Sequence, residues 1–270
     1  MKPRTKPLFT RPLPAFNFND QHDLAAIVGA LEQCGRPGIA MVSMRAASYY
    51  ELELLFEIFA FYRRKSSIPL WIELDHCADL SMLRRAAVIQ FDILMADFSH
   101  LPLEDNIKTV AGIVREMRSF PCLIEGESSP IPADVPMKED YGSLMPSALA
   151  HKFVAETGCD LVAPNLGTLH GFKRRKPAID KRFVEEIVRA VSVPVVAHGC
   201  DYLTSHDISV LCETGVRKLN FGPQLRDIWC TACRAEWQRS DTDRPDQRSI
   251  HHAANDALRS AISGILGSLR

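Results

Sequence analysis

The sequence has no long hydrophobic run and no excess of charge of either sign. Its 270 residues include 32 Lys and Arg against 33 Asp and Glu, for a formal net charge of -1. A chain with balanced charge is not expected to bind nucleic acid or a charged membrane surface. No apolar run approaches the roughly 20 residues of a membrane-spanning helix, and the basic segment Met1–Arg11 has no apolar stretch typical of a secretory signal. These absences predict a cytoplasmic protein.

The cysteines do not form a recognisable disulfide framework. The 8 Cys are scattered over positions 34, 77, 122, 159, 200, 212, 230 and 233. Such a spread indicates reduced thiols, in agreement with a cytoplasmic location. Cys230 and Cys233 form a C-x-x-C pair, but no second pair stands nearby, so we interpret both as ordinary helix positions.

Apolar, strand-like runs alternate with segments of helical periodicity along the whole chain. Short apolar runs bounded by Gly and Pro are typical of buried strands. The runs begin near Leu13, Gly38, Pro69, Phe91, Pro121, Leu161, Val193 and Arg217. Helices are predicted over Ala46–Arg64, Asn106–Met117, Pro146–Thr157 and, at the end of the chain, about Ile250–Leu269.

Eight regular units without a break in composition predict one α/β domain, a (β/α)8 TIM barrel. It would span residues 1–270, with a C-terminal helical extension from about residue 238 that packs on the barrel or on a second subunit. The alternative is an open, doubly wound sheet, but the regularity favours closure and no G-x-G-x-x-G follows the first strand. The connection Ser128–Met145 is rich in Pro, Ser, Asp and Gly, which is typical of a lid or an insert.

Three histidines stand at the ends of three of the apolar runs. His76 closes the run from Ile68, His170 the run from Leu161, and His198 the run from Val193. A barrel gathers the carboxyl ends of its strands at one mouth, where such folds build their sites. Three imidazoles that meet there would bind Zn²⁺ and leave its fourth position open for chemistry.

Acidic residues end the neighbouring runs. Asp75 precedes His76, Asp97 ends the next run, and Glu125 and Glu127 end the one after. Asp75 and His76 would point to opposite faces of a regular strand, but a turn at the strand end would bring both into one pocket. Asp75 would then do chemistry or orient an imidazole. Glu125 is open to a simpler interpretation, as an ion-pair partner at the rim.

An ordered set of motifs resembles the class II, metal-dependent fructose-bisphosphate and tagatose-bisphosphate aldolases. The motifs occur in the family's order from about residue 13 to 229. They are Leu13-Pro14-Ala15-Phe16-Asn17, Leu74-Asp75-His76, Asp97-Phe98-Ser99-His100-Leu101-Pro102, Ile124-Glu125-Gly126-Glu127, Gly167-Thr168-Leu169-His170-Gly171, Val196-Ala197-His198-Gly199 and Lys218-Leu219-Asn220. The family fold is itself a (β/α)8 barrel.

The resemblance implies a role for each matching position. It makes His76, His170 and His198 the ligands of one catalytic Zn²⁺ and Asp75 the acid/base that serves the aldehyde oxygen. Asp97 and Glu127 match carboxylates that hold or approach a second or displaced metal position, for a divalent or monovalent cation. The implied substrate-binding positions are Asn17, Gly171, Gly199 and Asn220.

The match departs from the family where the donor's phosphate would bind. Asp201 stands at or beside the position of a family Ser, and a carboxylate repels phosphate. Asn220 is followed by Phe221-Gly222-Pro223, so a Thr hydroxyl is missing and Pro223 has no N–H to donate. The basic run Lys173–Lys176 would provide a substitute anion site or form a solvated loop, and we count Lys173 and Asp201 among the substrate-binding positions.

These features predict a zinc-dependent aldolase-like C–C lyase. It would act on a ketose or ketose-phosphate-like donor through a metal-stabilised enediolate, with an altered phosphate site. The strand ends carry no Lys for a Schiff base, which favours the metal route. The alternatives are a conventional ketose-bisphosphate aldolase and a non-catalytic barrel that keeps metal for structure or regulation. A small-molecule sugar partner and a homo-oligomer, dimer or tetramer, are expected.

Overall fold

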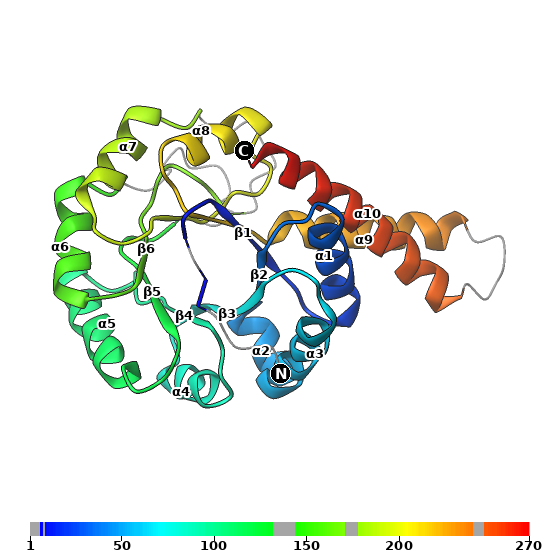
Figure 1. Cartoon of the computed structure of the whole chain (residues 1–270), viewed down its shortest axis with the longest axis horizontal. Coiled ribbons are helices and arrows are strands. Elements are labelled where there is room, and N and C mark those ends of the chain that lie inside the picture. The colour runs from blue at the N-terminus through cyan, green and yellow to red at the C-terminus, as the bar shows by residue number, and fades with distance from the viewer. Residues whose placement is uncertain (1–5, 8, 132–143, 171–177, 240–245, 270) are drawn as a thin grey trace.

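Eight parallel strands form a nearly closed barrel surrounded by helices (Figure 1). The computed structural model describes residues 6–7, 9–131, 144–170, 178–239 and 246–269. The strand order is β6-β5-β4-β3-β2-β1-β8-β7, and a parallel bridge between Val162 and Val195 links the two ends. The predicted (β/α)8 TIM barrel is therefore confirmed.

The strands follow the predicted apolar runs. They are β1 Leu13–Asn17, β2 Gly38–Ser43, β3 Leu70–Cys77, β4 Ile93–Ala96, β5 Leu123–Glu127, β6 Leu161–Ala163, β7 Val196–Ala197 and β8 Lys218–Phe221. The helices are α1 Gln21–Gln33, α2 Met44–Tyr50, α3 Leu52–Lys65, α4 Leu80–Val88, α5 Leu103–Met117, α6 Ser147–Thr157, α7 Lys181–Ala190, α8 Ser205–Glu213, α9 Pro223–Arg239 and α10 Gln247–Ser268.

The prediction of one continuous helix over Ala46–Arg64 is wrong. The chain breaks at Glu51, whose φ of 66° lies outside the helical region, so α2 and α3 are separate helices. Within α3, Leu54 is 52% exposed, whereas Leu52, Leu55 and Phe59 are buried. By contrast, α6 ends at Thr157 as predicted, and the following Gly158 adopts the left-handed conformation that glycine tolerates.

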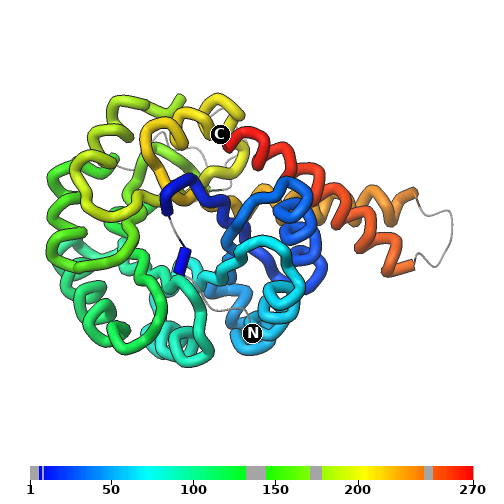
Figure 2. Tube along the Cα trace, in the orientation of Figure 1, coloured from blue at the N-terminus to red at the C-terminus, as the bar shows by residue number. Residues whose placement is uncertain are grey.

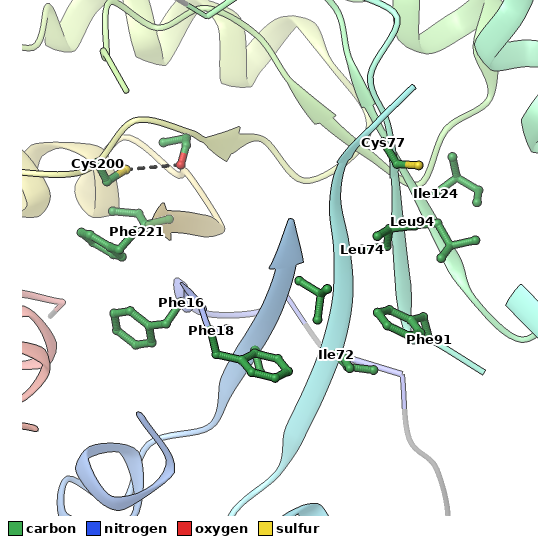
Figure 3. Close-up of a cluster of buried hydrophobic side chains, with 14 of the residues drawn as sticks. Phe16, Phe18, Ile72, Leu74, Cys77, Phe91, Leu94, Ile124, Cys200 and Phe221 are labelled. Carbon is green, nitrogen blue, oxygen red and sulfur yellow. Dashed lines mark hydrogen bonds between the residues drawn. The ribbon is translucent and has the colours of Figure 1, made fainter. Parts of the chain in front are cut away.

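Strand alternation divides the core into two layers. Residues such as Ile72 and Leu74 point outward and pack under the helices, together with Phe16, Phe18 and Phe91 (Figure 3). The alternate residues fill the barrel interior, where the apolar ones are Leu13, Ala15, Ile39, Met41, Trp71, Ile93, Met95, Leu161, Ala163 and Val196. The inward positions nearest the strand ends carry the polar residues described below.

Helices α9 and α10 form an antiparallel pair that extends beyond the barrel (Figure 2). Helix α10 packs on α1 and α9, and Leu258, Ile262 and Leu266 are buried along it. The predicted final helix is thus present, although it begins at Gln247 rather than Ile250. None of the described helices combines the length and the apolar character that a bilayer crossing requires.

Candidate active site

A cavity of about 440 Å³ opens where the strands end. Its walls come from the ends of strands β1, β2, β3, β5 and β8 and from the segments that follow the strands of the barrel, including those after β4, β6 and β7. Of the residues predicted for the site, the cavity is lined by Asn17, Asp75, His76, Asp97, Glu127, His170, His198, Asp201 and Asn220. The fold therefore gathers side chains that are distant in the sequence around one space.

The three predicted histidines meet in this cavity. The centroid of the His76 ring lies 5.0 Å from that of His170 and 4.7 Å from that of His198, while the His170 and His198 centroids are 5.8 Å apart. One nitrogen from each ring lies within 4.8 Å of the others. Nε2 of His76 and Nδ1 of His198 are 3.0 Å apart. This arrangement provides three nitrogen donors for one metal ion.

A backbone turn at His76 brings Asp75 and His76 into the same cavity. Glu73 and Asp75 point inward by strand alternation, so a regular strand would point His76 outward. His76 instead adopts a φ of 50°, and the pairing of β3 with β4 shifts register between Leu74 and Cys77. This local departure from strand geometry aims both consecutive polar side chains at the site.

Two carboxylates hold the opposite nitrogen of His76. Its Nδ1 lies 2.7 Å from Oδ2 of Asp97 and 3.2 Å from Oε2 of Glu127. The Ser99 hydroxyl bridges the same two residues, at 2.8 Å from Asp97 and 3.0 Å from Glu127. A proton on Nδ1 leaves the Nε2 lone pair facing the other histidines. His76, Asp97 and Glu127 also form a second group with metal-ligand spacing.

The electrostatics of this cluster favour a protonated His76 beside an ionised Asp97. Burial opposes protonation of His76, but Asp75, Asp97 and Glu127 together raise the pKa of its ring well above the usual value. Burial likewise disfavours ionisation of Asp97, but the contact with His76 holds the pKa of that carboxyl well below its usual range. A charged imidazole carries a proton on both nitrogens. Because a metal ligand must be deprotonated, a metal ion at Nε2 of His76 would have to displace the proton on that nitrogen.

Glu125 contacts the third histidine from below the cavity. Its Oε1 lies 2.8 Å from Nε2 of His198, and both side chains are almost completely buried. Nδ2 of Asn220 lies 3.0 Å from the same ring nitrogen. Glu125 is thus an ion-pair partner, but its expected place at the rim is wrong, because the side chain points into the barrel interior.

Gly199 allows the segment that carries His198, after β7, to approach the segment that carries His170, after β6. It has a φ of 62°, and an added Cβ would lie 2.6 Å from the backbone carbon of Leu169. No side chain fits so close to rigid backbone. Gly199 thus allows the two histidine-bearing segments to lie close together. It is not among the residues that line the cavity, although it was predicted to bind substrate.

Asp75 lines the cavity and has one oxygen held by Asn17. Nδ2 of Asn17 donates to Oδ2 of Asp75 over 3.2 Å. Within the described part of the chain, the buried Oδ1 accepts no hydrogen bond. The carboxylate is 5% exposed and lines the cavity beside His76. Its position suits proton exchange with a bound molecule.

Asp201 caps the beginning of α9. One of its oxygens, Oδ1, accepts from the backbone N–H groups of Gly222 and Gln224, both over 2.9 Å. Pro223, between them, has no N–H to offer. The carboxylate is 1% exposed. The donors that this turn presents are therefore already used by a side chain of the protein.

The sequence interpretation missed two buried residues beneath the site, Glu73 and Lys218. Nζ of Lys218 donates to Oε1 of Glu73 and to Oε2 of Glu125, each over 2.7 Å, and all three side chains are fully buried. Burial disfavours the ammonium group, but the two carboxylates raise the pKa of Lys218. A lysine that stays protonated is a poor nucleophile, so it is unsuited to form a Schiff base.

Some predicted positions lie outside the described residues. They are Gly171, the basic run Lys173–Lys176 that includes Lys173, and most of the connection Ser128–Met145. The substitute anion site and the lid thus stay predictions.

Comparisons with known proteins show the family and the fold of this chain. The family model for fructose-bisphosphate aldolase class-II matches residues 11–269. The YdjI aldolase from Escherichia coli K12 is similar in structure, with a TM-score of 0.81 and 20% sequence identity over 96% of this chain and 91% of that chain. A candidate fructose-1,6-biphosphate aldolase from Coccidioides immitis gives a TM-score of 0.84 and 25% identity, over 96% and 91%. Fructose-bisphosphate aldolase from Campylobacter jejuni gives 0.79 and 15%, over 96% and 90%.

Proposed function

The chain belongs to the class II fructose-bisphosphate aldolase family, and from this premise we propose that it is a zinc-dependent aldolase with an altered site for the donor's phosphate. The observation that carries the proposal is the meeting of three histidines and Asp75 in one cavity. The family predicted from the motifs is thus confirmed, while the metal, the roles of individual residues and the substrate are our proposals.

The donor set fits a zinc ion. A tetrahedral Zn²⁺ holds nitrogen ligands at about 2.0–2.1 Å, which places neighbouring ligand atoms about 3.3 Å apart. The 3.0 Å between Nε2 of His76 and Nδ1 of His198 is close to this spacing. His170 would provide the third ligand, and the cavity leaves room for a substrate oxygen. When bound there, Zn²⁺ would polarise the donor's carbonyl and stabilise the negative charge that C–C cleavage leaves.

Asp75 would carry the proton of the cleavage step. In our proposal Oδ1 takes the proton from the hydroxyl on the carbon that becomes the aldehyde, and the C–C bond electrons move to the donor fragment. Asn17 keeps the carboxylate in place through Oδ2. Asp97 and Glu127 would orient His76 and mark the position for a second or displaced cation. Asn220 would contact the donor from the edge of the same cavity.

The cap at the start of α9 supports an altered phosphate site. A phosphate is bound well where backbone N–H groups converge at a helix N-terminus. Here Gly222 and Gln224 already donate to Asp201, and the negative carboxylate would repel a second anion. A donor with an uncharged group at this end fits the turn better than a phosphorylated one.

Replacement of Asp201 by Ser should improve binding of a phosphorylated donor. The change frees two backbone donors and removes one negative charge. A hydrogen bond to a charged group contributes about 1.5–3 kcal/mol, which corresponds to roughly tenfold or more in affinity. We therefore expect the inhibition constant of dihydroxyacetone phosphate to fall at least about tenfold, measured by competition in the cleavage assay.

Asp23→Asn is the matched control, since Asp23 also lines the cavity but bonds Asn19 rather than α9. It should leave that inhibition constant nearly unchanged. If both variants improve binding equally, only net charge matters. If neither does, Asp201 does not set the donor's charge.

A conventional ketose-bisphosphate aldolase is the second candidate. The observation that favours it is the presence of Arg45 and Arg226 at the cavity, where they would face an anionic substrate. Metal analysis followed by cleavage assays on fructose and tagatose bisphosphates, beside unphosphorylated ketoses, separates the two. Efficient turnover of a bisphosphate would show that the protein is a conventional ketose-bisphosphate aldolase. Bound metal without cleavage of any ketose would indicate the non-catalytic barrel.

A further inference from the structure

A chain of buried polar contacts runs from the barrel interior to the proposed metal site. Glu73 accepts from Lys218, Lys218 also donates to Oε2 of Glu125, and Oε1 of Glu125 lies 2.8 Å from Nε2 of His198. None of the four side chains is more than 1% exposed. Buried charges persist only when they are paired and hydrogen-bonded, so each link of this chain constrains the next.

The chain sets which nitrogen of His198 carries the proton. An ionised carboxylate accepts hydrogen bonds and donates none. Oε2 of Glu125 accepts from the Lys218 ammonium group over 2.7 Å, an ion pair that keeps the carboxylate ionised, and Oε1 faces Nε2 of His198 over 2.8 Å. Nε2 of His198 must therefore donate to Glu125, and the lone pair lies on Nδ1. That is the nitrogen 3.0 Å from Nε2 of His76, on the side of the metal site.

We propose that Glu125 is a positioning residue that fixes His198 in the metal-binding tautomer, and that Lys218 keeps Glu125 in the orientation this requires. Glu73 balances Lys218 and makes no contact with His198. The inference rests on the proposed function, because it needs His198 to be a metal ligand. It adds two residues beneath the ligands, Glu125 and Lys218, to which the metal affinity is sensitive.

The isosteric change Glu125→Gln should reverse the tautomer. Lys218 donates only, so it would capture the amide oxygen and turn the amide N–H₂ toward Nε2 of His198. Nε2 would then accept, the proton would move to Nδ1, and Nδ1 could bind metal only after losing it. Loss of such a partner typically weakens metal affinity about 10–100-fold. Two readouts test this: the zinc dissociation constant, by competition with a chelator, and the His198 tautomer, by ¹⁵N NMR of the metal-free protein.

Glu73→Gln is a matched control. It replaces a carboxylate of the same length, equally buried and bonded to the same lysine. Because Glu73 does not contact His198, a neutral amide at this position leaves the contact between Glu125 and that ring in place. We expect Glu73→Gln to leave the zinc dissociation constant within about threefold of wild type and the tautomer unchanged, whatever it does to the melting temperature.

The outcomes are distinct. Weaker zinc binding and a reversed tautomer in Glu125→Gln alone support the inference. Equal weakening in both variants would show that the buried charges act only through stability, and unchanged binding in Glu125→Gln would overturn the positioning role. If the wild-type protein itself binds no zinc, the proposed function fails, which is a different result from either.

Discussion

Removal of any one of the three imidazoles should abolish tight zinc binding while the barrel stays folded. Binding of zinc to a full set of protein ligands is worth about 10–16 kcal/mol, so one of four ligands accounts for roughly 3–4 kcal/mol, or about 10²–10³-fold in affinity. We expect this loss in His76→Ala, His170→Ala and His198→Ala, measured by chelator competition. The rings lie at the polar mouth, and the apolar interior is built from other residues, so circular dichroism should show an intact barrel.

His206→Ala is a suitable control, because His206 is an exposed residue near the beginning of α8. It should retain one equivalent of zinc with wild-type affinity. Stoichiometric, tight zinc in any of the three site variants would remove that histidine from the ligand set.

Replacement of Asp75 by Asn should stop catalysis without loss of metal. The amide keeps the size of the side chain and can still accept from Asn17, which now holds Oδ2. It has no group that exchanges a proton near neutral pH, and general acid–base catalysis typically contributes 10²–10⁴-fold. We expect kcat to fall by about that factor, while zinc content and KM change little.

The same assay on Asp23→Asn should give nearly wild-type kcat, since that carboxylate also lines the cavity but bonds Asn19 rather than Asn17. Near-normal turnover in zinc-loaded Asp75→Asn would assign the proton transfer to another group. A parallel loss of zinc would show instead that Asp75 acts through the metal ligands.

The sequence was sufficient to predict the barrel and the convergence of the histidines. Apolar runs of strand length recur eight times. In a closed barrel, polar residues at the carboxyl ends of the parallel strands all lie at the same mouth. The split of the helix at Glu51 was not predictable from apolar periodicity, since the pattern continues through the break. The turn at His76 follows from one backbone torsion, a φ of 50°. The residue types around this position do not predict that torsion.

The sequence contained a pattern that could have identified the buried charged residues beneath the site, Glu73, Glu125 and Lys218. Glu73 stands two residues before Asp75, Glu125 two before Glu127, and Lys218 two before Asn220. Because alternate residues of a strand share a face, each of these must point inward if the site residue does. Three charged residues at inward positions of a barrel have to pair with one another. Which oxygen faces His198, however, depends on three-dimensional packing.

Hydrogen–deuterium exchange of a small ketone donor tests the central claim most directly, because it isolates the metal-dependent half of the reaction and needs no aldehyde. Dihydroxyacetone and dihydroxyacetone phosphate would each be incubated in D₂O with chelator-treated protein, with and without one equivalent of Zn²⁺, and followed by proton NMR. We predict exchange at the hydroxymethyl carbon only with zinc, its loss in His198→Ala, and faster exchange for the unphosphorylated ketone. Exchange that survives chelation, or none for either ketone in protein that holds one equivalent of zinc, would contradict a zinc-dependent aldolase.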